Sequence, residues 1–133
     1  MTTASHAVFA TPPAAPTEAR AHFGALLAFE TDCWDVHEAL ATGDPGFVLL
    51  DVRGAGAFAA GHVEGAVHLP HREIATVTLA GFPADTRFVV YCAGPHCNGA
   101  DKAALRLAEL DRRVKKMIGG VEGWHDEGFP LVT

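Results

Sequence analysis

Two cysteines, Cys92 and Cys97, are the residues of this 133-residue chain best suited to chemistry, and they share the stretch "VVYCAGPHCNGADKAA" (89–104). A cysteine thiolate is a strong nucleophile, and a second thiol nearby can attack a sulfur that the first one holds. Cys92 ends an apolar run, and an alanine-rich segment that favours a helix follows Cys97. The pattern therefore predicts a nucleophilic thiol at the point where a buried strand gives way to a helix.

The loop that joins this strand to the helix is expected to form the reactive site. Because the first N–H groups of a helix lack backbone partners and carry the positive end of its dipole, they stabilise an anion. We therefore expect the loop to favour the Cys92 thiolate and to lower its pKa. Gly94 allows close approach and a positive φ, Pro95 stiffens the loop, and Asn98 is expected to cap the helix together with Asp101. The predicted active-site loop consists of Ala93, Gly94, Pro95, His96, Cys97 and Asn98.

The elements that must position this loop alternate between strands and helices. "FVLLDV" (47–52) and "RFVVYC" (87–92) are short, continuous apolar runs, which is typical of strands covered on both faces. Further strands are predicted in "GAVHLP" and "RVKKMIGG", and helices in "DCWDVHEALATGD", "AFAAGH", "HREIATVT", residues 99–110 and "VEGWHDEG". Such alternation predicts an α/β fold, a small parallel sheet flanked by helices on both faces. In that fold the carboxyl ends of the strands form the reactive edge.

The chain is expected to form one domain with an extension at its N-terminus. Residues 1–16, rich in Ala, Pro and Thr, predict a flexible tail, and residues 17–133 a single domain. Residues 17–30 predict an additional helix, capped by Thr17, with apolar side chains gathered on one face.

Composition excludes several classes of partner. The formal net charge is −6, whereas a nucleic-acid or anionic membrane surface requires a basic face, so neither partner is expected. No apolar run approaches the roughly 18 to 20 residues that span a bilayer, and the N-terminus lacks the pattern of a signal peptide. Three cysteines, an odd number, do not suit a disulfide framework and favour the reducing cytoplasm.

Three segments resemble the signatures of the rhodanese domain. "LLDVRGAGAFAAGHVEGAVHLPHREI" (49–74) resembles its first signature, "VVYC" with the following helix its active-site segment, and "MIGGVEGWHDEGFPL" its C-terminal signature. Their order and spacing agree from about residue 30 to residue 133. The resemblance implies a sulfurtransferase without a cofactor, in which Cys92 takes sulfane sulfur from thiosulfate or a persulfide donor and holds it as a persulfide. The acceptor would be cyanide, a small thiol or a protein thiol. Asp51, Arg53 and His62 are expected to support the site by fixing its loops.

Two departures from the family pattern bear on the substrate. Many rhodaneses carry an arginine at the fifth position after the cysteine, where this chain has Cys97, and no Lys or Arg lies between Cys92 and Lys102. We therefore expect thiosulfate, a dianion, to be a poor donor and favour a persulfide or protein donor. Rhodanese-like phosphatases need an arginine at the sixth position, which is Asn98 here, so phosphatase activity is not expected.

Two readings of the thiol pair stay open from the sequence. Cys97 either resolves a Cys92 persulfide, with release of sulfide and formation of a disulfide, or only packs beneath the loop. The alternative to an enzyme is a non-catalytic rhodanese-like module that binds a partner or senses oxidants through the Cys92/Cys97 pair.

A metal site is not expected. His68, His71, His96 and Cys97 are candidate ligands, but their spacing does not match a zinc site, which needs three or four ligands, and the chain has no Cys-x2-Cys pair.

Overall fold

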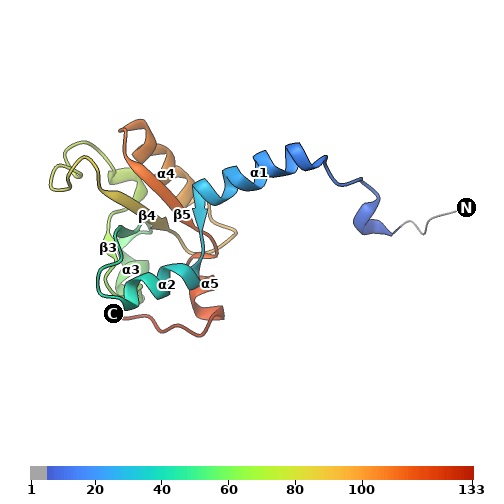
Figure 1. Cartoon of the computed structure of the whole chain (residues 1–133). Helices are drawn as coiled ribbons and strands as arrows, with labels where there is room; N and C mark the ends of the chain where they lie inside the picture. The colour runs from blue at the N-terminus through green and yellow to red at the C-terminus, as the bar shows by residue number, and fades with distance from the viewer. Residues whose placement is uncertain (1–5) are drawn as a thin grey trace, which may run out of the picture.

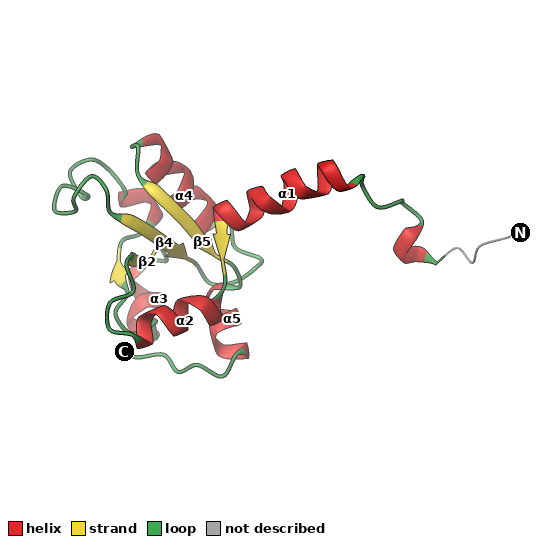
Figure 2. Cartoon of the chain, in the orientation of Figure 1, coloured by secondary structure: helices red, strands yellow, loops and turns green. Residues whose placement is uncertain are grey.

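A computed structural model describes residues 6–133, and its five strands run parallel in the order β1-β5-β4-β2-β3 (Figures 1 and 2). The strands are β1 (Glu30–Thr31), β2 (Val48–Asp51), β3 (Val67–His68), β4 (Arg87–Tyr91) and β5 (Arg113–Met117). The α-helices are α1 (Pro16–Phe29), α2 (Cys33–Ala41), α3 (Ala55–Ala60), α4 (Gly99–Glu109) and α5 (Gly120–Asp126). Two short 3-10 helices, η1 (Ala7–Phe9) and η2 (His71–Glu73), complete the order.

The two predicted central strands, β2 and β4, are neighbours and are covered on both faces. Leu50 pairs with Val90, and both side chains are fully buried on the face that α4 covers. Leu49 pairs with Val89 on the opposite face, which packs against α2 and α5. Burying each such aliphatic side chain contributes about 1.5–3 kcal/mol, so these continuous apolar runs hold the sheet between its two helical layers. The predicted α/β fold is confirmed.

One predicted helix is much shorter than expected. Of "HREIATVT", the segment 71–73 alone forms a 3-10 helix, and turns follow it. The hydroxyl of Thr78 donates to the carbonyls of Glu73 and Ala75 at 2.7 and 3.0 Å and accepts from the Ala75 N–H at 2.9 Å. These side-chain bonds replace the backbone bonds that a continuing helix would need.

The additional N-terminal helix is present and projects away from the body of the molecule (Figure 1). Thr17 does not cap α1, because the N-cap residue is Ala15 and Pro16 takes the first helical position, where its missing N–H costs nothing. The predicted flexible tail falls partly outside the described residues, at 1–5, and its remainder contains η1. Across residues 6–133, no helix is both long and apolar enough to cross a membrane.

Candidate active site

Cys92 follows the last residue of β4 and lines a cleft at the carboxyl ends of the strands. The cleft has a volume of about 530 Å³, and Cys33 and Cys97 line it together with Cys92. Cys92 is 7% exposed, so it forms part of the cleft floor rather than its rim. The sequence expectation that a thiol ends the strand at the reactive edge of the sheet agrees with this position.

The loop after Cys92 turns back on itself and brings Cys97 beside it. The Cys97 N–H donates to the Gly94 carbonyl at 3.0 Å, which closes a four-residue turn with Pro95 at its second position, where proline is favoured. The thiol of Cys92 donates a hydrogen bond to the sulfur of Cys97. The two thiols therefore form one hydrogen-bonded pair.

Gly99, the first residue of α4, lies against both sulfur atoms. Its N–H donates to the Cys97 sulfur at 3.4 Å. A β-carbon at this position would lie 2.7 Å from the Cys92 sulfur and 3.4 Å from the Cys97 sulfur, so the close approach requires glycine. Asn98 stands at the N-cap position without a side-chain bond, and Asp101 contacts Lys116 at 3.0 Å, so the predicted capping pair is wrong.

The expectation of a lowered Cys92 pKa is wrong for the resting pair. Burial, followed by the hydrogen bond to Cys97, raises the pKa of the Cys92 thiol to about 11, although the N–H groups of Ala93 and Gly99 act in the opposite direction. The hydrogen bonds from Cys92 and Gly99 lower the pKa of Cys97. The first proton to leave the pair therefore leaves from Cys97, and the thiolate is stabilised there.

The first turn of α5 holds the other side of the loop. The N–H groups of Val121 and Glu122 donate to the carbonyls of Cys92 and Ala93 at 3.1 and 2.9 Å. A β-carbon on Gly120 would collide with the Cys92 carbonyl oxygen, and the residue has a φ of 58°, so both space and conformation call for glycine. Gly119, the N-cap residue of α5, and Gly120, its first residue, thus let a helix N-terminus dock directly on the loop.

The side chain of Glu122 crosses the loop from the same turn of α5. Its carboxylate lies where a β-carbon on Gly94 would be, and it pairs with His96 at 3.1 Å, both side chains being largely exposed. Gly94 is therefore required for close approach, whereas the positive φ expected for it is not found.

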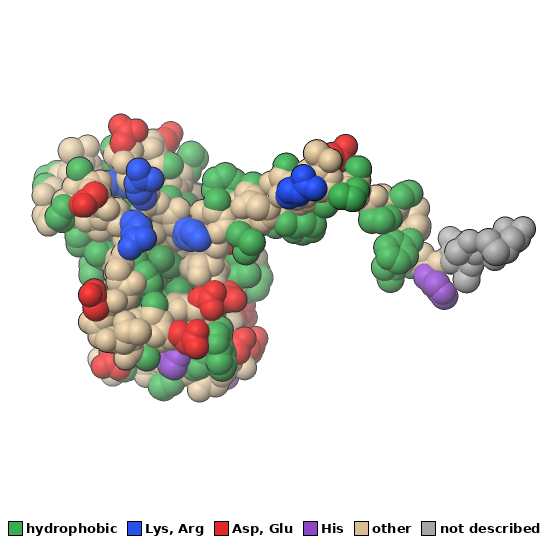
Figure 3. Space-filling model, in the orientation of Figure 1, with side chains coloured by type: hydrophobic (Ala, Val, Ile, Leu, Met, Phe, Trp, Pro, Cys, Tyr) green, Lys and Arg blue, Asp and Glu red, His purple; other side chains and the backbone are tan. Residues whose placement is uncertain are grey.

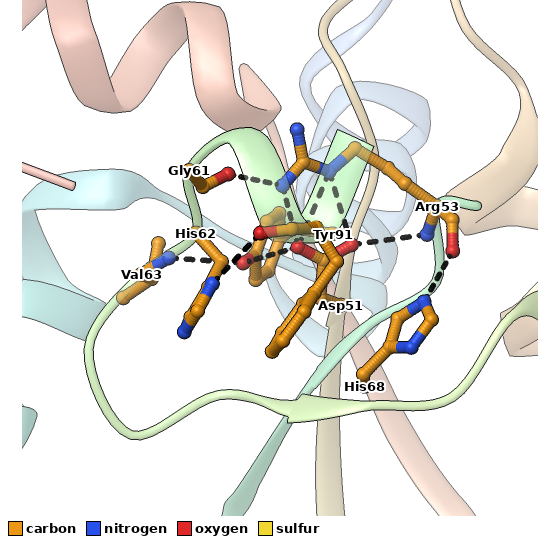
Figure 4. Close-up of polar contacts among 8 residues, drawn as sticks. Asp51, Arg53, Gly61, His62, Val63, His68 and Tyr91 are labelled. Atoms are coloured by element: carbon orange, nitrogen blue, oxygen red, sulfur yellow. Dashed lines mark hydrogen bonds and ion pairs between the residues drawn. The ribbon is translucent and has the colours of Figure 1, made fainter. Parts of the chain in front are cut away.

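Asp51 and Arg53 form a buried clamp beside the loop (Figure 4). The Asp51 carboxylate is fully buried and accepts from the Arg53 side chain at 2.7 to 3.2 Å, from the Arg53 N–H at 3.0 Å and from the Tyr91 hydroxyl at 2.7 Å. Arg53 also donates to the Gly61 carbonyl at 2.6 Å, and Tyr91 accepts from the Val63 N–H at 3.1 Å. The clamp joins the ends of β2 and β4 to the loop after α3.

His62 is held in that same loop. A ring nitrogen of His62 lies 2.9 Å from the Phe58 carbonyl, and its ring stacks on that of Phe58 with centroids 3.7 Å apart. Its backbone exchanges two hydrogen bonds of 2.8 Å with Val132. These contacts fit the expected supporting role rather than proton transfer at Cys92.

The electrostatic character of the cleft is acidic. Asp32, Asp101 and Glu127 line it. Lys116 is the single Lys or Arg among the described residues that line it, and it is paired with Asp101 at 3.0 Å and with Glu30 at 3.4 Å. The cleft therefore offers no uncommitted cation to a dianionic ligand.

The third cysteine, Cys33, faces the same cleft from the start of α2 and belongs to the core. Its thiol donates to the carbonyls of Ile118 and Gly120 at 3.5 and 3.6 Å, and burial raises its pKa to about 11. Within residues 6–133, no group of three His, Cys, Asp or Glu side chains is arranged to hold a metal ion.

Sequence reasoning did not identify several residues that shape this site. Gly99, Gly120 and Tyr91 each act through a contact with a residue distant in the chain or through a close approach, and nothing in a single sequence marks such contacts. The acidic lining combines residues from three separate segments, so no local pattern marks it either. For Gly120 the sequence offered one signal, its pairing with Gly119, which indicates a turn.

Comparison with known proteins agrees with this geometry. The Rhodanese-like domain family matches residues 35–127, and the chain belongs to that family. A thiosulfate sulfurtransferase GlpE of Pseudomonas entomophila is 36% identical over 89 residues, which cover 65% of this chain and 78% of that protein.

Two further relatives match the chain to different extents. The HTH-type transcriptional regulator Rv0324 of Mycobacterium tuberculosis is 35% identical over 83 residues, which cover 62% of this chain but 36% of the regulator. The crystal structure of the BH2092 protein from Bacillus halodurans superposes with a TM-score of 0.85 at 36% identity, and the match covers 89% of this chain and 86% of that one.

Because the Asp51 carboxylate holds the clamp together, we expect its removal to destabilise the protein strongly. Asp51→Ala leaves the Arg53 guanidinium, 10% exposed, without its partner, and we expect a loss of about 3–5 kcal/mol in the free energy of unfolding. Tyr91→Phe removes one hydroxyl and is expected to lower the free energy of unfolding by about 1–2 kcal/mol. Urea unfolding measures both, with the exposed Asp44→Ala as the control. Equal stability of Asp51→Ala and the control would contradict the clamp.

The docking of α5 on the loop predicts a specific effect of one added methyl group. Gly120→Ala must displace the Cys92 carbonyl and strain the backbone, so we expect a loss of about 1–3 kcal/mol and a changed rate of Cys92 alkylation. Gly56→Ala in α3 is the matched control, since its β-carbon meets nothing within 4 Å. A Gly120→Ala protein as stable as the control, with Cys92 equally reactive, would refute this role.

Proposed function

We propose that the protein is a sulfurtransferase that carries sulfane sulfur as a persulfide on Cys92. The observation that carries the proposal is the position of the Cys92 sulfur on the floor of a cleft, with the N–H groups of Ala93 and Gly99 directed at it. Such amides stabilise an anionic sulfur without a general base or a metal ion. The membership of the family and the similarity to a named sulfurtransferase support the same class of reaction.

The thiol pair supplies the proton transfer that the first step needs. Cys92 passes its proton to the Cys97 thiolate along their hydrogen bond, and the Cys92 thiolate then attacks the outer sulfur of the donor. The donor S–S bond breaks, and its electron pair leaves with the donor thiolate or, from thiosulfate, with sulfite. Cys92 keeps the transferred sulfur as an anionic persulfide next to the loop amides. No net oxidation occurs, since one sulfur–sulfur bond replaces another.

Discharge of the persulfide has two routes. An external thiolate attacks the outer sulfur, and Cys92 leaves as a thiolate, which completes the transfer. Alternatively, the Cys97 thiolate attacks the inner sulfur, hydrosulfide leaves, and a Cys92–Cys97 disulfide remains. Two external thiols, which become a disulfide themselves, must then reduce that disulfide before another cycle.

The charges of the cleft favour a donor other than thiosulfate. Three carboxylates line the cleft, and Lys116 is already paired with two acids. Arg53 is committed to Asp51 and to a backbone carbonyl, so it offers no guanidinium to the loop. Thiosulfate brings both of its charges to the reacting sulfur against this field, whereas the reacting group of a persulfide donor carries at most one. We assign the donor to the persulfide class and place the reaction in a reducing compartment such as the cytoplasm, which keeps the pair reduced.

A redox-sensing module is the second candidate, and one observation favours it. The raised pKa of Cys92 and the lowered pKa of Cys97 make Cys97 the more reactive thiol towards an oxidant in the resting protein. Oxidation of Cys97 to a sulfenic acid, followed by attack of Cys92 with loss of water, would close the disulfide. The similarity to part of a transcriptional regulator is compatible with such a module.

Intact-mass analysis distinguishes the two candidates. Reduced protein is exposed to thiosulfate and, separately, to glutathione persulfide, with Cys92→Ser, Cys97→Ser and Cys33→Ser compared in parallel. We expect a gain of one sulfur atom with the persulfide donor, little gain with thiosulfate, and loss of the adduct in Cys92→Ser alone. An adduct that decays in the wild type and persists in Cys97→Ser would assign resolution to Cys97. The absence of an adduct from either donor would refute the sulfurtransferase and favour the sensor.

A further inference from the structure

The N-terminal arm, residues 6–29, carries large apolar side chains that its own chain leaves exposed. Phe23, Leu27 and Phe29 of α1 are 60%, 74% and 66% exposed, and Val8 and Phe9 near the tip of the arm are 79% and 64% exposed. Figure 3 shows these hydrophobic surfaces along the projecting arm, with few charged groups among them. Large apolar side chains exposed in such number on one segment mark an interaction site.

The helix α1 lacks internal support for its conformation. It has 14 residues, none of them buried, and its N-cap makes no side-chain hydrogen bond. An isolated helix of this length is marginal in water, and most helices are stabilised by packing of an apolar face. The principal anchors of its C-terminal end are the pairing of β1 with β5 and the bond from the Lys115 ammonium to the Leu27 carbonyl at 2.7 Å. A stable α1 therefore requires a partner surface.

The base of the arm and the body of the molecule form such a surface between them. A groove of about 640 Å³ lies there, and its apolar part consists of Phe23, Leu26 and Leu27 of the arm and Ile118 of the body, which is 44% exposed. The rest of its lining is polar, namely Glu30, Thr31, Asp32, Asp35 and Lys115. Asp32 and Ile118 also line the cleft above Cys92. The groove and the candidate active site therefore share a wall.

An apolar arm and a groove with an apolar part at its base are present on the same chain, and a twofold interface requires both surfaces on each copy. Two arms that pair antiparallel place the tip of each arm at the base of the other. The exposed apolar side chains of one arm amount to roughly 600–800 Å², close to the share of one partner in an interface of standard size. A membrane surface is the weaker alternative, because Arg20 is the single Lys or Arg of α1 and the chain is acidic.

The arm also belongs to a solved relative. The match to the Bacillus halodurans structure covers 89% of this chain, whereas residues 30–133 make up less than four fifths of it, so the match extends into the arm. Part of the arm therefore has a counterpart in that structure.

We propose that the protein forms a twofold homodimer in which the α1 helices pair antiparallel and Val8 and Phe9 of each arm enter the groove at the base of the other. The partner's arm then borders the active-site cleft at Asp32 and Ile118 and narrows access to Cys92 from that side. The dimer does not depend on the sulfurtransferase activity.

Sedimentation velocity on the full chain tests the proposal. We expect a species of twice the 14.0 kDa chain mass that dissociates on dilution. The double variant Phe23→Asp/Leu27→Asp is expected to sediment as a monomer. Leu105→Asp is the matched control, because Leu105 is 62% exposed on α4, away from the arm, and this variant is expected to remain a dimer.

Hydrogen exchange measured on the wild type tests the dimer without any variant, so it still applies if the double variant fails to fold. We expect the amides of residues 20–29 to exchange more slowly as protein concentration rises, since the partner stabilises the helix. A monomeric wild type at high micromolar concentration would overturn the proposal, whether or not it binds vesicles of anionic lipid. A dimer that persists in a folded double variant would overturn it as well.

Discussion

The contact on which the site depends is the docking of the first turn of α5 against the loop after Cys92. Two N–H groups, those of Val121 and Glu122, donate to the carbonyls of Cys92 and Ala93, and this fixes the direction in which the loop leaves β4. Because these carbonyls point at α5, the N–H groups of Ala93 and Gly99 are left to face the sulfur atoms. The N-terminus of α5 packs against the loop, and the N-terminus of α4 follows the loop in the chain. These two helix N-termini define the environment of the thiol.

As a result, the two thiols have different roles in the reaction. Burial protects Cys92 and disfavours its thiolate, while Cys97, less buried and nearer to the helix start, stabilises the charge. Proton transfer along their hydrogen bond makes the Cys92 thiolate available when a donor fills the cleft. The acidic lining of the cleft and the commitment of Lys116 and Arg53 to other partners then disfavour highly charged anions.

The sequence was sufficient for the fold and for the position of the thiol, but not for the properties of the thiol. β2 and β4 were predicted because their apolar runs are continuous, and Cys92 was placed because it ends one of them. The pKa prediction failed since it weighed the helix dipole and loop amides but not burial, which depends on what packs above the strand. The expected capping by Asn98 and Asp101 failed because Asp101 pairs with Lys116 of β5, a contact that no local pattern reveals. The exposure of α1 was equally invisible, since an apolar face in a sequence suggests an internal partner.

The most direct test of this account is a pH titration of the protein with ¹³C-labelled cysteine β-carbons, followed by NMR, with the signals assigned from the three single Cys→Ser variants. The account predicts that Cys97 titrates first and that Cys92 does not complete its own titration until the pH approaches about 11. In Cys92→Ala, which removes the thiol donor, the pKa of Cys97 is expected to rise. Titration of Cys92 before Cys97, or independent titration of both as ordinary thiols, would contradict the account.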